Sequence, residues 1–250
     1  MKNDISLVMI TQNEEKDIKN CLNSISGLVS EMVIIDSGST DKTLDIAKDY
    51  GARIYKRKLD NFGRQKNFAI SKTKNDWILN LDADEMIPKE LKTEIKKAIN
   101  SSYDGFYLPC DSYFLGKRMN HFEGWHQEPK LRLFKKSKML FQEQKIHEQV
   151  KAKGKIGSLK NPILHYSYSN IKECLKKAEE YSDYMADPLI TPFSRFNVIK
   201  IFLKPPYTFL KRYFYQLGFL DSWRGFCLAA LSAYHDFKVH IKVQRKMRNL

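Results

Sequence analysis

The first hundred residues alternate short apolar runs with segments of helical periodicity, and this pattern restricts the fold more than any other feature of the chain. The apolar runs read as strands at 5–10, 32–35, 52–55 and 77–81. The segments between and after them read as helices at 18–25, 43–51, 61–72 and 90–99. Such alternation predicts βαβ units. We therefore predict an α/β fold with a mixed, mainly parallel sheet and helices on both of its faces.

Polar residues follow three of these strands. Asn13 comes after the first strand, Asp36 follows the second, and Asp82 and Asp84 follow the strand at 77–81. Ligands of parallel sheets gather at the carboxyl ends of the strands, so we expect these residues in one crevice. Carboxylates at the end of a buried strand are costly to desolvate unless a positive group meets them, and their oxygens suit Mg²⁺ and Mn²⁺. A solvated turn without a metal is the alternative for an isolated pair of aspartates.

The positive charge of the chain is concentrated near its end. The net charge is +14, and residues 195–250 hold eleven Lys or Arg and two Asp, a net of +9. Such a segment favours a nucleic acid, an anionic membrane surface or a phosphorylated substrate as partner.

The hydrophobic fraction of 42% allows a sizeable core. The four widely spaced cysteines form no C-x-x-C pair, which argues against a zinc site or a disulfide framework and favours a reducing compartment.

The second half of the chain has a different pattern. Four aromatic-rich runs are strand-like and separated by turns, which predicts antiparallel additions to the sheet at 103–114, 130–134, 139–141 and 162–166. A helix follows at 170–187, and Pro188 and Pro192 mark a linker. The sequence therefore predicts two domains, 1–187 and 188–250.

The predicted domain 188–250 has the pattern of a basic amphipathic helical extension. Basic residues such as Lys204 and Lys211 are interleaved with aromatic residues such as Phe202 and Phe214 at helical spacing. This pattern is typical of a helix that lies in a membrane interface. A helix packed on its own domain, with its lysines in water, is the alternative. No apolar run approaches 18 residues, so no transmembrane helix is predicted, and the first apolar run is too short for a signal peptide.

Four motifs occur in the order and spacing of one enzyme family. They are Thr11-Gln12-Asn13-Glu14-Glu15, Ile34-Ile35-Asp36-Ser37-Gly38-Ser39-Thr40-Asp41, Phe62-Gly63-Arg64-Gln65-Lys66-Asn67 and Leu81-Asp82-Ala83-Asp84-Glu85. Together they resemble family-2 glycosyltransferases, which are inverting, nucleotide-sugar-dependent enzymes with the GT-A fold, over about residues 4–150. Later motifs resemble the branch of β-1,4-glucosyltransferases that adds glucose to the heptose of a lipopolysaccharide inner core, at 125–134, 146–148 and 218–221.

The resemblance implies a binding site for a UDP-sugar donor. Asp36 would accept a hydrogen bond from the uracil, and Arg64 and Lys66 would neutralise phosphates. The residues implied for the nucleotide-sugar are Thr11, Asn13, Glu14, Asp36, Ser37, Arg64, Lys66 and Asp82. The residues by themselves leave two alternatives open. Asp36 could be a turn aspartate bonded to its own backbone, and the basic pair could be solvated helix charges.

The resemblance also implies a metal site and a catalytic base. Asp84 and Asp82 would hold Mn²⁺ or Mg²⁺ as a DXD motif, with His147 as a third ligand or a phosphate donor, although a lone histidine is more often a structural hydrogen-bonding group. Glu128 would take the proton from the acceptor hydroxyl, and it stands where the family usually has an aspartate. Further residues would support the acceptor or the site, namely Trp125, Arg132 and Glu148.

The implied function is the transfer of a hexose from a UDP-sugar to a lipid-linked glycan, such as the lipopolysaccharide inner core. The transfer would depend on a metal and invert the sugar carbon, and UDP-glucose is the expected donor. The protein would be peripheral to the cytoplasmic face of the inner membrane, held by residues 195–250, with its oligomeric state left open.

One alternative is a glycosyltransferase with a peptide or protein acceptor. Another is a nucleotidyltransferase, against which the lack of glycine in residues 11–15 counts. The last is a basic nucleic-acid-binding protein, for which the chain shows no helix-turn-helix, zinc-finger or RNP-like motif, so no nucleic-acid partner is expected.

Overall fold

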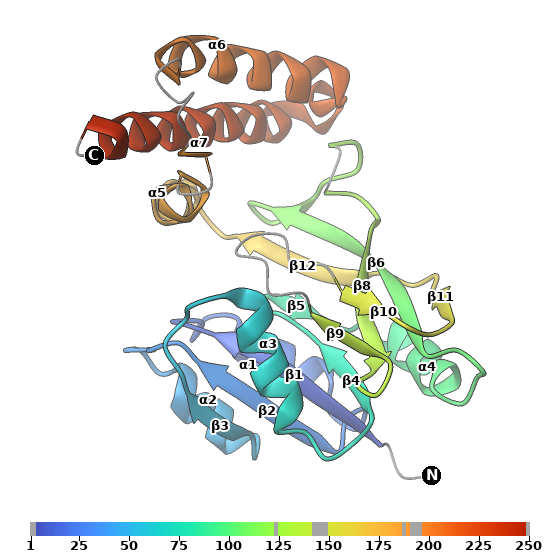
Figure 1. The fold of residues 1–250 in the computed structure, drawn as a ribbon. Helices are drawn as coiled ribbons and strands as arrows, with labels where there is room; N and C mark the ends of the chain where they lie inside the picture. Colours follow the sequence, from blue (N-terminus) through green and yellow to red (C-terminus); the bar gives the residue numbers. More distant parts are fainter. Residues whose placement is uncertain (1–3, 123–124, 142–149, 187–188, 191–196, 249–250) are drawn as a thin grey trace. The chain divides into compact units, whose positions relative to one another are not determined.

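The contacts of the chain group into two compact units (Figure 1). A computed structural model describes residues 4–122, 125–141, 150–186, 189–190 and 197–248. The first unit, here the sheet unit, comprises 1–111 and 127–165, and the second, here the helical unit, comprises 112–126 and 166–250. The chain therefore passes between the units at points other than the domain boundary predicted after residue 187, and that boundary stays a prediction. Pro188 and Pro192 lie outside the described residues.

The strands and helices follow the predicted pattern closely. The strands are β1 (Ile5–Thr11), β2 (Glu31–Asp36), β3 (Arg53–Lys56), β4 (Trp77–Asn80), β5 (Glu85–Met86), β6 (Gly105–Phe114), β7 (Lys117–Arg118), β8 (Glu128–Lys135), β9 (Met139–Phe141), β10 (Val150–Ala152), β11 (Ile156–Ser158) and β12 (Ile163–Tyr168). The α-helices are α1 (Ile18–Ser24), α2 (Thr43–Asp49), α3 (Phe62–Ser71), α4 (Lys89–Ala98), α5 (Ile171–Ala186), α6 (Asn197–Leu210) and α7 (Ser222–Arg248). A π-helical turn, η3 (Lys211–Tyr215), and a 3₁₀-helix, η4 (Gly218–Asp221), lie between α6 and α7.

The main sheet has the strand order β3-β2-β1-β4-β8-β6-β12-β5, with β7 and β11 paired to β6. β1 is parallel to both β2 and β4, and β2 is parallel to β3. β8 is antiparallel to β4 and to β6, and β12 is antiparallel to β5. The predicted mixed sheet with a parallel first half is confirmed. The unpredicted strands β5, β7, β10 and β11 have only two or three residues each, too few to show a period.

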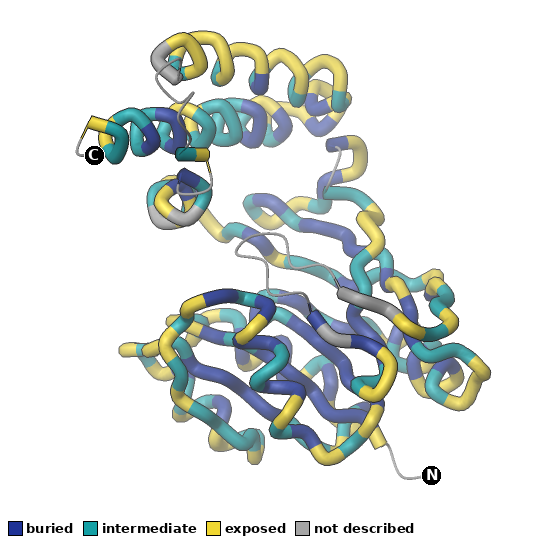
Figure 2. Tube along the Cα trace, viewed as in Figure 1, coloured by how far each residue is buried: buried dark blue, intermediate teal, exposed yellow. Residues whose placement is uncertain are grey.

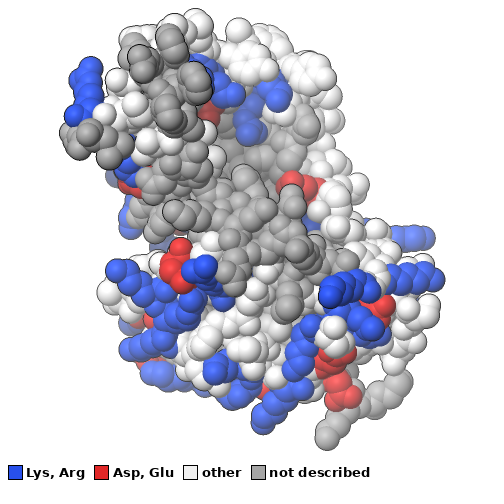
Figure 3. Space-filling model, in the orientation of Figure 1, with Lys and Arg blue, Asp and Glu red and all other residues white. Residues whose placement is uncertain are grey.

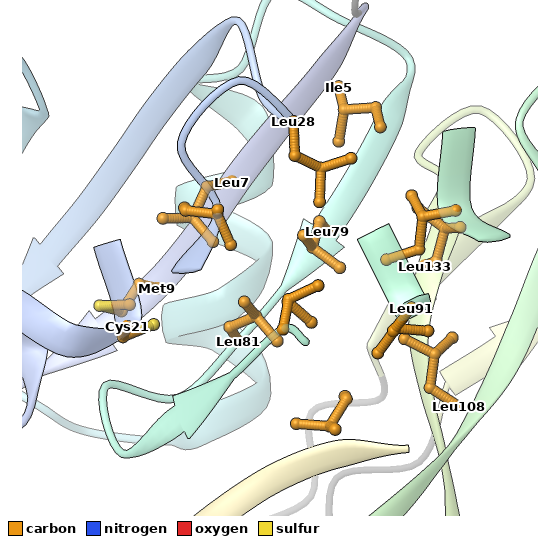
Figure 4. Close-up of a cluster of buried hydrophobic side chains, with 14 of the residues drawn as sticks. Ile5, Leu7, Met9, Cys21, Leu28, Leu79, Leu81, Leu91, Leu108 and Leu133 are labelled. Carbon is orange, nitrogen blue, oxygen red and sulfur yellow. The ribbon is translucent and has the colours of Figure 1, made fainter. Parts of the chain in front are cut away.

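Helices cover both faces of the parallel half of the sheet because successive side chains of a strand point to opposite faces. Leu7 and Met9 of β1 pack in one buried cluster with Cys21 of α1 and Leu91 of α4 (Figure 4). Val8, between them in sequence, packs in a second cluster with residues of α3. The strands β1, β2 and β4 are largely buried along their length (Figure 2). Each fully buried side chain of this size stabilises the fold by about 1.5–3 kcal/mol, so the sheet is a rigid support for the loops at its edge.

The helical unit contains α5, α6, α7 and the segment 112–126. The predicted C-terminal helical extension is therefore present. α6 continues through Pro205 and Pro206, although a proline inside a helix removes a backbone hydrogen bond and clashes with the preceding turn. The π-helical turn η3 follows directly, and the amide of Gln216 donates to the carbonyl of Lys211 at 2.8 Å. None of the described helices has the length and apolar character needed to cross a membrane.

Asp221 holds the segment 112–126 to the rest of the helical unit. Its carboxylate accepts the backbone N–H groups of Asn120, His121 and Phe122 at 3.0, 3.1 and 2.8 Å. Gly225 allows this region to pack closely, because a β-carbon there would lie 1.8 Å from the carbonyl oxygen of Gly218. The motif at 218–221 therefore has a structural role within this unit.

Replacing Asp221 with asparagine is expected to speed hydrogen exchange of the amides at 120–122 about 10- to 100-fold, because each hydrogen bond to a charged acceptor contributes about 1.5–3 kcal/mol. Hydrogen–deuterium exchange followed by mass spectrometry measures this directly. Asp183→Asn, which removes an exposed carboxylate paired with Lys242 in the same unit, is the control. Equal exchange in both variants and the wild type would show that Asp221 does not anchor the segment.

Candidate active site

The polar residues predicted to share a crevice all belong to the sheet unit. β1 lies between β2 and β4, so the carboxyl ends of these three parallel strands meet at one edge of the sheet. Thr11 ends β1 directly opposite Asp36, the last residue of β2. Asp82 and Asp84 follow Asn80, the last residue of β4. The topology therefore brings together residues that are more than seventy positions apart in the sequence.

Hydrogen bonds join the loop after β1 to the turn after β2. The N–H of Asn13 donates to Ser39 Oγ at 2.9 Å, and Asn13 Oδ1 accepts the N–H of Thr40 at 2.8 Å. Asn13 has a left-handed backbone, with φ of 57°, a conformation that asparagine tolerates. The N–H of Glu14 donates to Thr43 Oγ1 at 2.7 Å. These bonds fix the position of two segments that the sequence implicates in nucleotide binding.

Asp36 has the local bonding expected of a turn aspartate. Its carboxylate accepts the N–H of Gly38 at 3.1 Å and both the N–H and the hydroxyl of Ser39. Ser37 donates its N–H to the carbonyl of Thr11, and its hydroxyl accepts from Gln65. The N–H of Ser39 also lies 3.1 Å from the second carboxylate oxygen, so each oxygen of Asp36 has two contacts within this turn. The role of Asp36 toward uracil stays a prediction.

Two buried polar atoms at the same strand ends have no hydrogen-bond partner among the described residues. They are Oγ1 of Thr11 and Oδ1 of Asn80. Buried polar atoms are almost always paired, and an orphan in a native structure indicates a missing water, ion or ligand. Their position at the ends of β1 and β4 favours a ligand site at this edge.

Arg132 is the centre of a buried charge cluster beside the crevice. Its guanidinium donates to Asp82 Oδ2 at 2.6 Å and to Glu85 Oε1 at 2.5 Å, and Lys130 Nζ lies 3.6 Å from Glu85. Glu85 is fully buried. The register between β6 and β8 pairs Tyr107 with Leu131 and Phe106 with Leu133, so Arg132 is the extra residue of a β-bulge. Bulges re-aim side chains near active sites, and this one directs Arg132 toward the acids.

Basic residues hold Asp82 in its ionised form. Burial by itself opposes ionisation, but the charges of Arg132, Lys66 and Lys130 outweigh it and hold the pKa of Asp82 well below its usual range. The Asp82 side chain is 41% exposed, so solvent screens part of this attraction. Lys66 itself is buried on α3, with its Nζ 5.3 Å from the centre of the Phe141 ring.

His165 lies next to Asp84, and no pattern in the sequence indicated this pair. Its Nε2 is 3.2 Å from Asp84 Oδ2. Burial would lower the pKa of His165, but hydrogen bonds with Asp84 and Cys110 and the charges of Asp84 and Glu85 raise it to about 10. Pairing of β12 with β5 brings His165 opposite Glu85, and this non-local pairing has no local sequence signal.

The donor atoms beside Asp84 fit a divalent cation of the Mn²⁺ type. Ligand atoms of Glu85, Cys110 and His165 lie within 4.8 Å of one another. The charge of Glu85 is already met by Arg132 and Lys130, and a thiol is too soft a ligand for this class of metal. Asp84 Oδ2, 3.2 Å from His165 Nε2, adds a carboxylate oxygen beside this group, and carboxylate oxygen and imidazole nitrogen are both ligands of this class of metal.

The other predicted site residues lie in the sheet unit, in the helical unit or outside the described residues. Glu128 is exposed at the start of β8 and pairs with Cys110 of β6. Because alternate residues of a strand point to the same face, Glu128 lies on the same face of β8 as Lys130. Arg64 is exposed on α3. Trp125 belongs to the helical unit, where it stacks with Tyr168 in an aromatic cluster. His147 and Glu148 lie outside the described residues.

Comparison with known proteins identifies the class of this chain. Residues 6–158 match the family described as glycosyl transferase family 2. The chain belongs to this family, as its four motifs predicted, and it is a glycosyltransferase. The nucleotidyltransferase and nucleic-acid-binding alternatives are therefore set aside.

Two relatives match this chain over most of its length. An uncharacterized glycosyltransferase of Rickettsia bellii is 31% identical over 93% of this chain and 83% of the relative. The lipopolysaccharide core biosynthesis glycosyltransferase LpsC of Rhizobium meliloti is 28% identical over 94% of this chain and 93% of the relative. The crystal structure of S. aureus TarS 1–349 in complex with UDP covers 98% of this chain and 92% of its own, with a TM-score of 0.50 and 17% identity. At that identity the structural likeness shows the fold alone.

Proposed function

We propose that this glycosyltransferase moves a hexose, with glucose as the first candidate, from a UDP-sugar to a lipid-linked glycan, with inversion at the sugar carbon and with a divalent metal. The observation that carries the proposal is the edge formed by β1, β2 and β4, where Asp36, Asp82 and Asp84 gather beside buried basic residues. A site of this kind suits a nucleoside diphosphate, whose charge needs both a cation and basic side chains.

The donor would bind along this edge. Thr11, Asn13 and Asp36 would meet the base, and the unpartnered hydroxyl of Thr11 supplies a free hydrogen-bonding group there. Asp82 would face the ribose and the metal. Lys66 and Arg64 would neutralise the phosphates, with Glu14 and Ser37 completing the walls.

Asp84, Asp82 and His165 would hold Mn²⁺ or Mg²⁺. When bound, the metal supplies Lewis-acid stabilisation of the departing diphosphate. Arg132 keeps the loop that carries the aspartates in place through its bonds to Asp82 and Glu85. His147, outside the described residues, stays a candidate for a further ligand.

Glu128 would act as the general base. Inversion requires a single displacement, in which the acceptor hydroxyl attacks the sugar carbon from the side opposite the diphosphate while a base takes its proton. A carboxylate does this within about 2.6–3.2 Å of the hydroxyl. The exposed position of Glu128 on the Lys130 face of β8 leaves it accessible to an acceptor. Trp125 and Glu148 stay candidates for acceptor contacts.

The similarity to LpsC, a lipopolysaccharide core glycosyltransferase, supports a lipid-linked saccharide as the acceptor. The proposal includes a peripheral location at the cytoplasmic face of the membrane, and the surface of the helical unit supports contact with a membrane. Large apolar side chains are exposed along α6, η3, η4 and the start of α7, including Phe202, Leu203, Phe214, Tyr215, Phe219 and Trp223. Lys and Arg side chains lie around α6 and α7 (Figure 3). Exposed aromatic residues with flanking cations suit an anionic lipid interface.

Replacing Phe202 and Tyr215 with serine is expected to weaken binding to vesicles of anionic phospholipid at least about tenfold, because these side chains are 71% and 80% exposed and available for insertion. Vesicle co-sedimentation measures the change, and added salt should weaken binding further. The pair Ile171→Ser and Leu175→Ser, exposed apolar residues on α5, is the matched control. Equal binding by all three proteins would contradict insertion of the α6–η3 surface.

UDP release from a panel of UDP-hexoses in Mn²⁺, with and without a lipid-linked saccharide acceptor, tests the proposed reaction. We expect one UDP-hexose to support acceptor-dependent release that EDTA abolishes, and the product to have the opposite anomeric configuration. Release stimulated by a peptide acceptor and not by the lipid-linked saccharide would favour the peptide alternative.

A further inference from the structure

The helical unit contains a pocket of about 520 Å³ that lies outside the proposed donor site. It is lined by residues of α5, α6, η3 and α7, together with Trp125 and Tyr168. All of its lining residues belong to the helical unit, so the pocket is a property of that unit by itself. Its volume is enough for a small polar ligand of one or two sugar rings.

The described lining residues are strongly basic. Four are cationic, namely Lys177, Lys204, Lys211 and Arg212, and one is acidic, Asp236. The carboxylate of Asp236 already accepts the hydroxyl of Thr208. Lys204 lies 5.4 Å from the ring centre of Tyr207, and neither Lys204 nor Lys211 forms an ion pair with a described residue. An excess of cations in a concave site attracts an anion, because the walls focus their field.

Aromatic and amide groups accompany these cations. Trp125, Tyr168, Tyr181 and Tyr207 line the pocket, and aromatic faces pack well against the apolar faces of sugar rings. Gln216 also lines it, and its Oε1 is buried without a hydrogen-bond partner among the described residues. An orphan acceptor of this kind needs a donor, which a sugar hydroxyl supplies.

The backbone that carries the cations is also unusual. Lys211 and Arg212 lie in the π-helical turn η3, directly after the two prolines of α6. π-Helical turns are rare and occur frequently at functional sites. The cationic side chains, the unpartnered Oε1 of Gln216 and the π-helical turn η3 therefore coincide at one pocket.

We infer that this pocket binds a phosphate-bearing saccharide, with the phosphate at Lys204, Lys211 and Arg212 and the sugar against the aromatic wall. The inference rests on the proposed function, since it assigns the pocket to the phosphorylated part of the glycan acceptor. Phosphatidylglycerol carries a phosphate too, but its headgroup offers no sugar ring to the aromatic residues.

Calorimetric titration of the full chain with glucose 6-phosphate, glucose and inorganic phosphate tests the inference without any need for catalysis. The test variant is Lys204→Gln/Lys211→Gln. The control is Lys172→Gln/Lys200→Gln, which removes two exposed lysines of the same unit that do not line the pocket. The two variants have equal net charge. Thermal melting and UDP binding, measured on each protein, report folding and the donor site separately.

We expect glucose 6-phosphate to bind the wild type at least tenfold more tightly than glucose or inorganic phosphate. The test variant should lose at least tenfold in affinity, and the control should stay within twofold. No binding by the wild type, or equal losses in the two variants, would overturn the inference. Equal affinity for inorganic phosphate and glucose 6-phosphate, together with a selective loss of phosphatidylglycerol vesicle binding in the test variant, would instead assign the pocket to a lipid headgroup. Failure of every protein to bind UDP would count against the proposed UDP-sugar donor and leave the pocket result standing.

Discussion

Replacing Asp84 with asparagine is expected to lower the turnover of sugar transfer at least about 100-fold. Asparagine keeps the shape of the side chain but offers a neutral oxygen, which is a much weaker ligand for a divalent cation. Loss of a residue that merely orients a metal ligand costs about 10- to 100-fold in affinity or activity, so loss of a direct ligand should cost more. UDP release with saturating donor measures turnover, and electron paramagnetic resonance of Mn²⁺ measures metal binding.

Asp45→Asn is the matched control for Asp84→Asn. Asp45 lies exposed on α2 and pairs with Lys48 at 3.1 Å, without a hydrogen bond to the proposed site residues among the described part of the chain. We expect its turnover to equal that of the wild type. Turnover of Asp84→Asn within threefold of the wild type, with unchanged Mn²⁺ binding, would remove Asp84 from the metal site.

Replacing Arg132 with leucine is expected to destabilise the sheet unit by about 3–5 kcal/mol, the usual cost of breaking a buried ion pair from one side. Glu85 is fully buried and would keep Lys130 Nζ, 3.6 Å away, as its remaining ion-pair partner among the described residues. Such a loss is a large part of the stability of a typical domain. Urea unfolding, followed by circular dichroism, measures the difference.

A second substitution separates the charge effect from lost packing. Glu85→Gln in the Arg132→Leu background removes the unpaired negative charge, so it should recover a large part of the loss. Lys135→Met, on the same strand, breaks a partly exposed pair with Asp104 and should cost less than about 1 kcal/mol. If Arg132→Leu costs no more than Lys135→Met, the buried cluster does not stabilise this edge of the sheet.

Local patterns were sufficient to predict most of the fold. The apolar runs and helical periods located β1, β2, β3 and β4 and the helices between them to within two residues, because each element carries its own period. The position of Asp36, Asp82 and Asp84 at one edge followed from the parallel order of the strands. Membership of glycosyl transferase family 2 followed from four ordered motifs.

Pairing between strands that are distant in the sequence accounts for the parts of the site that the sequence did not predict. His165 reaches Asp84 because β12 pairs with β5, eighty residues earlier, and β5 is too short to be recognised. Arg132 reaches Asp82 and Glu85 through a bulge that no pattern of apolar residues predicts. Likewise, the pocket of the helical unit forms where distant helices and Trp125 meet.

Calorimetric titration of UDP-glucose into the wild-type protein, in Mn²⁺ and again in EDTA, tests most directly whether the edge at β1, β2 and β4 is a metal-dependent donor site. We expect saturable binding with one site per chain in Mn²⁺, and an affinity at least tenfold weaker in EDTA. Binding of equal strength in EDTA would contradict a role for the metal at Asp84 and His165. No binding of UDP-glucose, UDP or any other UDP-hexose in Mn²⁺ would contradict the donor site itself.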